Sequence, residues 1–383
     1  MGALPLPAAP PARQRSQPAR WKAVAAEIAR IVRQNYYDPR AAESWALKYA
    51  RYTASADSEL KFAVVTKRAL AELKTSHTGY YTDRDPEYYA LLAIYGGMIH
   101  AGDGEVEGIG IDVTPDRFVR VVFAGSPAAE AGLRRGDRIL AADGKQFDPF
   151  ASFHGRAGVT AALKVERAAG QPPITFHVRP RRVKPKQEWL EALEKGAKLI
   201  RRNGKAVAYV PMFACAGEEF ENALKDQLNS RLRDADALIL DFRNGWGGCN
   251  PDFVNLFNAA PPVLTSIGRD GKEQQLDGQW RKPLYILING GSRSGKEAVA
   301  YSIKKNKLGT LVGQSTAGAV IAGRAFLLSD RSLLLLAVAD IRVDGERLEG
   351  HGVAPDVPVA DSLPYANGAD PQLEKAIDLA ARQ

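Results

Sequence analysis

The chain is poor in cysteine, with only two among 383 residues, and this scarcity limits what can hold its fold together. Two cysteines cannot form the disulfide framework of a small secreted scaffold, and they lack the spacing of a metal site. Long hydrophobic runs are also missing, since no stretch approaches the roughly 18 uninterrupted apolar residues of a membrane-spanning helix. The sequence therefore predicts no metal, no other cofactor and no stable membrane insertion.

Charge of one sign is not strongly dominant either. The formal net charge of +8 is moderate for this length and is spread along the chain. Short basic runs such as "RPRRVKPK" (179–186) are typical of a solvated linker, so no nucleic acid is expected as a partner. Hydrophobic residues at 45% and charged residues at 25% describe a globular protein, long enough for two or three domains.

Four segments differ in pattern. Residues 1–20 are rich in Pro and Ala and predict a flexible leader without the features of a signal peptide. Residues 21–103 repeat apolar side chains at helical spacing, and 104–183 show short apolar alternations typical of a small β-rich domain. Residues 184–383 alternate apolar strands with helices, which predicts an α/β core with a mainly parallel sheet flanked by helices.

Two further elements are expected near the end of the chain. The segment "RAFLLSDRSLLLLAVADIRV" (324–343) predicts a hairpin added to the core sheet. The segment "DPQLEKAIDLAARQ" (370–383) predicts a closing helix capped by Asp370.

The segment "GSPAAEAGLRRGDRILAADGK" (125–145) combines a small-residue turn, a short helix and the pairs "GD", "IL" and "DG". It resembles the PDZ domains of bacterial proteases, and the resemblance covers roughly residues 105–182. In that family the loop matching "GIGI" receives the C-terminal carboxylate of a peptide, because glycines let the backbone approach an anion. The residues of this loop are Gly108, Ile109, Gly110 and Ile111. The alternative is a PDZ fold that serves only as an internal brace.

The stretch "INGGSRSGKEAVA" (288–300) fits two kinds of site. Gly290 to Lys296 matches most of a nucleotide-binding loop, but Glu297 stands where a magnesium-binding hydroxyl is required. After a PDZ domain and inside an α/β core, the stretch resembles the serine loop of the tail-specific (C-terminal processing) peptidase superfamily. That resemblance makes Ser294, three residues before a Glu, the nucleophile, with Ser292 as a rival in the same loop.

Two glycines are candidates for stabilising an oxyanion. The free N–H groups of a helix start can do so, and Gly295 follows the serine. The segment "ILDFRNGWGGCN" (239–250) resembles the superfamily's D-x-R-x-N-x-G-G motif, which makes Gly247 the second donor. The other interpretation of this glycine-rich segment is a tight strand-to-helix turn.

The general base departs from the best-known branch of the superfamily, which uses a Ser–Lys dyad. In "LVGQSTAGAVIAG" (311–323), Ala319 stands in place of that lysine and Gly323 in place of a following Gln. The chain is more similar to the branch of the tricorn core and the interphotoreceptor retinoid-binding-protein-like domains, whose base comes from a Ser-His pair. In "LAELKTSHTGYY" (70–81) this implies His77 as the base, oriented by Ser76, and an imidazole with a pKa of about 6.5 suits that role.

An acidic partner is expected in "RLEGHGVAPDVPV" (347–359), which resembles the superfamily's E-G-x-G-V-x-P-D segment. Glu349 would hold Ser76 or His77 in place, unless this segment only closes the sheet. Lys296 is expected to be a solvated lysine at the helix start, pointing away from the nucleophile. It is the next base to consider if His77 is not involved.

A disulfide between Cys215 and Cys249 is a hypothesis, since each follows a core strand, and it would indicate an oxidising compartment. Together the resemblances imply a serine endopeptidase acting on proteins or peptides, with the PDZ domain capturing C-termini or gating the site. The alternative is a catalytically inactive peptide-binding scaffold. The family favours export to the periplasm and leaves a homo-oligomer open.

Overall fold

The computed structural model of the chain describes residues 17–382, and the first helix shows how its apolar residues are used. Trp21, Val24, Ile28 and Ile31 recur at helical spacing and are buried along one face. The helix begins at Gln17, four residues before the predicted start. The other residues of the predicted leader lie outside the described part of the chain.

The N-terminal segment is mainly helical, as the periodicity predicts. Its elements are α1 (Gln17–Asn35), α2 (Pro39–Lys48), η1 (Tyr52–Ser55), α3 (Glu59–Ala71), β1 (Gly79–Tyr81) and α4 (Pro86–Tyr95). The first three α-helices pack around Ile28, Phe62 and Leu70, and this cluster continues onto Leu334 and Leu336 from the far end of the chain. The segment that carries His77 is thereby fixed to a part of the protein that is distant in sequence.

The predicted hairpin exists, but its placement on the core sheet was wrong. It consists of β17 (Ala322–Leu327) and β18 (Leu333–Ala339), and β18 pairs with β1 in a separate three-stranded sheet. Tyr80 faces Leu334 in this pairing. The leucine-rich strand is covered by the N-terminal helices, while β19 (Val357–Pro358) takes the edge of the core sheet.

The middle segment forms a β-rich body with its own core, centred on Ile109, Ile139 and Leu163. A four-stranded sheet has the order β6-β5-β7-β8, and β2–β9 and β3–β4 form two separate pairs. The elements are β2 (Val106–Gly108), β3 (Ile111–Val113), β4 (Val119–Val122), α5 (Pro127–Glu130), β5 (Arg138–Ala142), β6 (Lys145–Gln146), β7 (Ala161–Glu166), β8 (Ile174–Val178) and β9 (Arg181–Val183).

The C-terminal segment is built on a six-stranded sheet of order β10-β11-β12-β15-β16-β19, parallel except for the β10–β11 pair. Its central strands β12 and β15 are buried at every position, as continuous apolar runs predict. The strands before β19 are β10 (Lys198–Arg202), β11 (Lys205–Pro211), β12 (Ala237–Asp241), β15 (Leu284–Ile288) and β16 (Thr310–Gly313).

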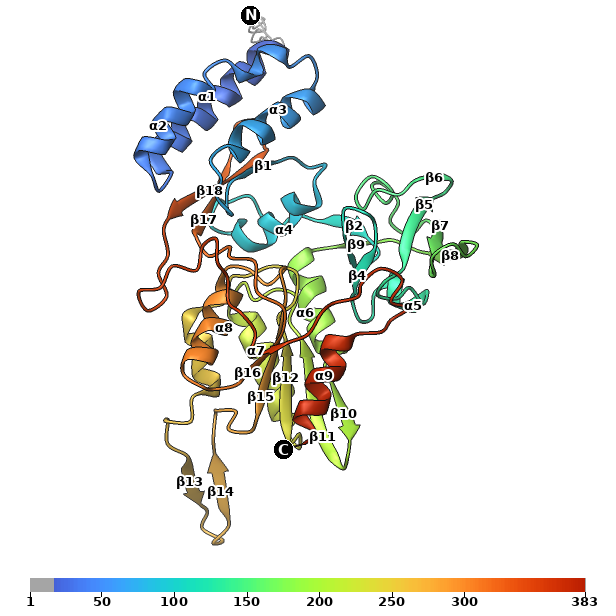
Figure 1. The fold of residues 1–383 in the computed structure, drawn as a ribbon, viewed down its shortest axis with the longest axis vertical. Helices are drawn as coiled ribbons and strands as arrows, with labels where there is room; N and C mark the ends of the chain where they lie inside the picture. Colours follow the sequence, from blue (N-terminus) through green and yellow to red (C-terminus); the bar gives the residue numbers. More distant parts are fainter. Residues whose placement is uncertain (1–16, 383) are drawn as a thin grey trace, which may run out of the picture.

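Helices cover both faces of this sheet (Figure 1). One face packs against α9 (Pro371–Ala380), whose cap is Asp370 as predicted, since the Asp370 side chain accepts from Leu373 N at 3.0 Å. The other face packs against four helical elements. These are α6 (Pro185–Gly196), α7 (Glu218–Asn229), η2 (Pro251–Phe257) and α8 (Gly295–Lys305).

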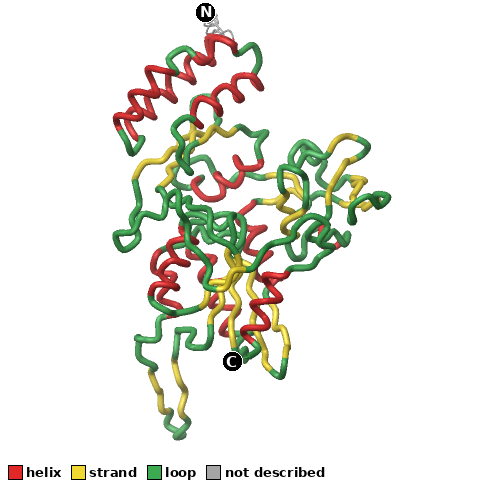
Figure 2. Tube along the Cα trace, viewed as in Figure 1, coloured by secondary structure: helices red, strands yellow, loops and turns green. Residues whose placement is uncertain are grey.

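A two-stranded hairpin of β13 (Leu264–Ile267) and β14 (Glu273–Leu276) projects from the core, and all its strand residues are exposed. Loops gather instead where the core meets the N-terminal segment (Figure 2). Within residues 17–382, none of the helices has the length and apolarity needed to cross a membrane.

Candidate active site

Ser294 stands immediately before α8, at the end of the loop that follows β15. Its backbone is in the left-handed region, with φ 57°, a conformation that non-glycine residues adopt only when the surroundings impose it. Two acceptors impose it here, because Ser294 N donates to Ala319 O at 2.8 Å and to Glu297 Oε2 at 3.1 Å. The half-buried side chain of Ser294 is left at the helix start, where a nucleophile is expected.

The rival serine is used for structure. Ser292 is fully buried, its hydroxyl donates to Phe242 O at 3.0 Å, and its Oγ accepts from Asn289 N at 3.0 Å. A substrate cannot reach this hydroxyl, so Ser294 is the candidate nucleophile of the loop.

Gly247 and Gly295 meet at Ser294. A Cβ added to Gly247 would lie 2.6 Å from Ser294 Cβ and 3.0 Å from Gly295 N. Gly295 in turn is pressed against Cys249, so neither position has room for a side chain. Within residues 17–382 neither glycine N–H donates a hydrogen bond, which leaves two donors beside the serine hydroxyl.

The structure brings Ser76, His77 and Glu349 together. Ser76 Oγ lies 2.8 Å from His77 Nδ1 and 3.0 Å from Glu349 Oε2, and Ser76 N donates to Glu349 Oε1 at 3.1 Å. A hydroxyl has one proton, so when Ser76 donates it to the carboxylate it accepts from His77 Nδ1–H. In this tautomer Nε2 carries a free lone pair, which is the state a general base requires.

Burial sets the protonation of this group. Burial lowers the pKa of His77 to about 4. The charge of Glu349 opposes this decrease, and the charge of Arg293 adds to it. Burial alone would raise the pKa of Glu349, but donors at Ile321, Val320 and Ser76 hold it below its usual value. Near neutral pH the imidazole is therefore neutral and the carboxylate is charged.

The histidine and the serine are linked through one segment, residues 316–321. Its first part is held by Glu297, which accepts from Thr316 Oγ1, Gly318 N and Ala319 N at 2.6–2.7 Å. Its last part is held by Glu349, which accepts from the N–H groups of residues 320 and 321 at 2.8 and 3.0 Å. No hydrogen bond joins His77 directly to Ser294 in the described part of the chain.

The structure shows what occupies the two positions, 319 and 323, at which the chain departs from the Ser–Lys pattern. Ala319 is buried, and both its backbone groups are used to hold Glu297 and Ser294. Gly323 lies under the imidazole, because a Cβ there would be 2.8 Å from His77 Cδ2. A glutamine at this position would occupy the space of the histidine ring.

The prediction of a solvated Lys296 was wrong. Its side chain is fully buried, and Nζ donates to Phe213 O at 3.0 Å and to Asn244 O at 2.9 Å. The side chain of Lys296 therefore runs into the protein and not to solvent.

The predicted carboxylate loop lines a cavity of about 200 Å³ shared with the core. Ile109 is buried, and Gly110 has φ 74° and no room for a side chain beside Ser126. The same cavity contains Glu188 from α6, whose Oε1 would be 3.2 Å from a Cβ on Gly110. Capture of a C-terminal carboxylate by this loop remains a proposal, and it would have to overcome this acidic neighbour. The loop consists of Gly108, Ile109, Gly110 and Ile111.

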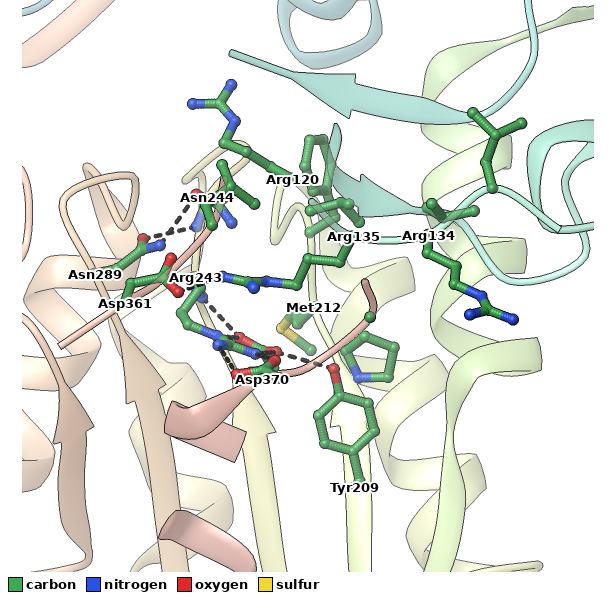
Figure 3. Close-up of a pocket in the computed structure, with 18 residues that line it drawn as sticks. Arg120, Arg134, Arg135, Tyr209, Met212, Arg243, Asn244, Asn289, Asp361 and Asp370 are labelled. Carbon is green, nitrogen blue, oxygen red and sulfur yellow. Dashed lines mark hydrogen bonds and ion pairs between the residues drawn. The ribbon is translucent and has the colours of Figure 1, made fainter. Parts of the chain in front are cut away.

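Cys215 and Cys249 form a disulfide, so the hypothesis of a bridge beside the oxyanion turn is confirmed. The turn is also tied to the serine loop by a pair of asparagines, since Asn289 Oδ1 accepts from Asn244 N at 3.1 Å and Asn289 Nδ2 donates to Asn244 Oδ1 at 3.1 Å. Close by, Arg243 donates to Asp370 within a cavity of about 380 Å³ between the core and the middle segment (Figure 3).

Sequence reasoning missed the roles of Glu297, Asn289 and Lys296. The first two carried a signal, since the glutamate belongs to the serine motif and the asparagine ends an apolar strand at that motif. Nothing in the sequence distinguishes a lysine that turns into the protein from one that turns to solvent.

A strained serine at a helix start, two free backbone donors and a histidine–carboxylate chain together form a candidate site for hydrolysis with a serine nucleophile. Comparison with known proteins finds two family matches. Residues 206–359 match "Peptidase family S41", and residues 118–153 match the "PDZ domain". The resemblances to both families are confirmed.

The relatives are named proteases. A "Carboxyl-terminal-processing protease" of Synechocystis sp. is 26% identical over 309 residues, which are 74% of this chain and 71% of the relative. The fold matches the tricorn protease with a TM-score of 0.59 and 20% identity, over 96% of this chain but 37% of the other. It also matches the photosystem II D1 C-terminal processing protease, with a TM-score of 0.52 and 21% identity over 92% and 98% of the two chains.

Proposed function

We propose that the protein is a serine peptidase that cleaves peptide bonds by a Ser–His mechanism. Ser294 attacks the scissile carbonyl, and His77 takes the serine proton and later delivers it to the leaving amine. The N–H groups of Gly247 and Gly295 stabilise the oxyanion of the tetrahedral intermediate. The observation that carries this proposal is the hydrogen-bond chain from Glu349 through Ser76 to His77, because it leaves Nε2 free to accept a proton.

A Ser–Lys mechanism has less support in this chain. The position of the dyad lysine holds Ala319, and Lys296, close to the serine in sequence, directs its ammonium group to two backbone carbonyls. Neither residue offers a free amine near Ser294 within the described residues.

Peptides or unfolded proteins are the proposed substrates, and the PDZ domain gates the site or captures substrate termini. Its groove supports this role, because the cavity at the carboxylate loop is also lined by Phe213 and Trp246 beside the oxyanion turn. The disulfide supports an exported, periplasmic setting, since such bonds persist in oxidising compartments. Exposed Leu264, Ile267 and Leu276 on the projecting hairpin offer a surface for a homo-oligomer.

The test is digestion of an unfolded protein, and of peptides with free or amidated C-termini, with products identified by mass spectrometry. Wild type is expected to cleave, and Ser294→Ala and His77→Ala to lose cleavage by at least about 10³-fold. Ser292→Ala serves as the matched serine control if it folds. Binding of peptides without cleavage by the wild type would favour the inactive scaffold, and full activity of His77→Ala would rule out the histidine mechanism.

A further inference from the structure

Lys296 is a buried ammonium group that the proposed mechanism does not use. It lies two residues after Ser294 in the first turn of α8, and its side chain has 0% exposure. Nζ donates to Phe213 O at 3.0 Å and Asn244 O at 2.9 Å and lies 5.8 Å from the centroid of the Phe242 ring. These acceptors belong to the segments that follow β11 and β12, so one side chain joins two strand ends.

Both carbonyls belong to the framework of the oxyanion turn, residues 244–247. Phe213 O also accepts from Trp246 N at 2.8 Å, and Cys215 N donates to Gly247 O at 3.2 Å. Hydrogen bonds thus join the turn to the segment after β11. Lys296 donates to this segment and to the turn from the protein interior.

We propose that Lys296 is a positioning residue of the oxyanion site, whose ammonium group fixes the carbonyls of Phe213 and Asn244 and thereby places the Gly247 N–H beside Ser294. This inference rests on the proposed peptidase function. It assigns the lysine a role through the turn and no contact with the substrate.

Burying the charge of Lys296 costs free energy of folding, and this cost favours a functional role for the lysine. Lys296 forms no ion pair within 4 Å in the described part of the chain, and an unpaired buried ammonium group opposes folding. The carboxylate of Asp241 is already engaged by Arg243 and by Tyr209. An apolar side chain of similar length would fill the space at lower cost, but it would leave the turn without these hydrogen bonds and without a nearby positive charge.

The charge of Lys296 changes close to neutral pH. Burial lowers its pKa to about 7, with Asp241 acting against this decrease and Arg293 adding to it. Below that pH the group is an ammonium ion, and above it the amine has lost its charge and one of its three donor hydrogens. The support it gives to the turn is therefore expected to weaken as the pH rises through about 7.

The experiment measures kcat and KM for peptide cleavage from about pH 5 to about pH 9 in wild type, Lys296→Met and Lys296→Arg. The control is Lys305→Met, which changes an exposed lysine on the same helix. The methionine variant is expected to lose about 10- to 100-fold in kcat with KM within about threefold, somewhat less than the loss of a direct oxyanion donor. Wild-type kcat should fall above about pH 7, and arginine, which stays charged, should abolish this fall if its larger side chain is accommodated.

A methionine variant with kcat within about threefold of wild type overturns the inference, as does a change confined to KM. If that variant does not fold, the other two proteins decide, because a fall above about pH 7 that persists in a folded arginine variant also overturns it. Cleavage that depends on Ser294 but not on Lys296 rejects this inference alone. Cleavage that does not depend on Ser294 rejects the proposed function and this inference with it.

Discussion

A histidine that accepts a proton in a hydrolytic site has to be neutral and held in one tautomer. Burial keeps His77 neutral, and the hydrogen bond from Ser76 to Glu349 favours the tautomer with the imidazole proton on Nδ1. Gly323 leaves the space in which the ring lies. Under the proposed mechanism, the neighbouring residue Ser76 and two residues from distant parts of the sequence, Gly323 and Glu349, prepare one nitrogen atom of His77 to accept a proton.

The low pKa of His77 predicts unusual tolerance of acid. At pH 5.5 a histidine with the ordinary pKa of about 6.5 would be only about one-tenth deprotonated, whereas His77, with a pKa of about 4, stays neutral. The kcat/KM of the wild type should therefore hold down to about pH 5 and fall as the pH approaches about 4. The measurement is kcat/KM against pH with a neutral peptide, and a fall centred near pH 6.5 would contradict the assignment of the base.

Among the structural elements, the proposed oxyanion turn is held by several cross-links. The disulfide joins the segment after β11 to the one after β12, and Cys215 N donates to Gly247 O at 3.2 Å beside it. The turn has no regular secondary structure of its own, so these cross-links replace the ladder of a strand or helix.

Reduction of the disulfide should loosen this turn and the whole fold. A bridge with a sequence separation of 34 removes unfolded-state entropy worth about 3–4 kcal/mol. We expect the unfolding midpoint in urea and kcat both to drop when reductant is added or when Cys215→Ser and Cys249→Ser are combined. The double variant should show no further response to reductant, and an unchanged midpoint after complete reduction would disprove the stabilising role.

Local pattern predicted the elements better than their pairing. The apolar runs in residues 184–383 indicated buried strands, which the structure shows at 237–241 and 284–288, and the cap of α9 stands at Asp370 as predicted. The partner of β18 could not be predicted, because β1 is only three residues long and lies about 250 positions away in the chain. Pairing at that distance is decided by which surface the helices cover, and periodicity contains no such information.

Residues of the candidate site could be predicted where they belong to a motif. They could not be predicted where side-chain packing determines the surroundings of a residue. Ser294, Gly247 and His77 were predicted from motifs that resemble those of the superfamily, and the lack of room at Gly247 and the positive φ of Ser294 show that two of these positions are constrained. Lys296 shows the limit, since helical spacing does not reveal whether a side chain at the helix start meets solvent or the protein interior.

At the scale of the whole molecule, the PDZ domain is held to the core through residues 361–369. Tyr365 N donates to Gly136 O at 3.0 Å, Gly368 N donates to Arg135 O at 2.8 Å, and Arg135 pairs with Asp361. The groove of the domain then faces Trp246 in the oxyanion turn. A ligand in that groove would touch the turn to which we assign the stabilisation of the oxyanion.

The acidic wall of this groove predicts how peptides bind there. Burial raises the pKa of Glu188 to about 7, with Arg181 opposing this and Glu191 adding to it, so the carboxylate is charged above that pH. In a Ser294→Ala background, Glu188→Gln should bind peptides with a free C-terminus about tenfold more tightly at about pH 8. The gain should shrink at about pH 6, where Glu188 is mostly protonated.

Fluorescence polarisation of labelled peptides gives these affinities, and Glu194→Gln, an exposed change on the same helix, is the control. An equal gain for amidated peptides would show that the loop does not recognise the terminal carboxylate.

The segment 316–321 connects the serine and the histidine of the candidate site. Glu297 holds its beginning and Ser294, while Glu349 holds its end and the pair that carries the base. A displacement of this one short segment would release nucleophile and base together. A change at either glutamate is therefore expected to disturb Ser294 and His77 together, because both residues depend on the placement of this one segment.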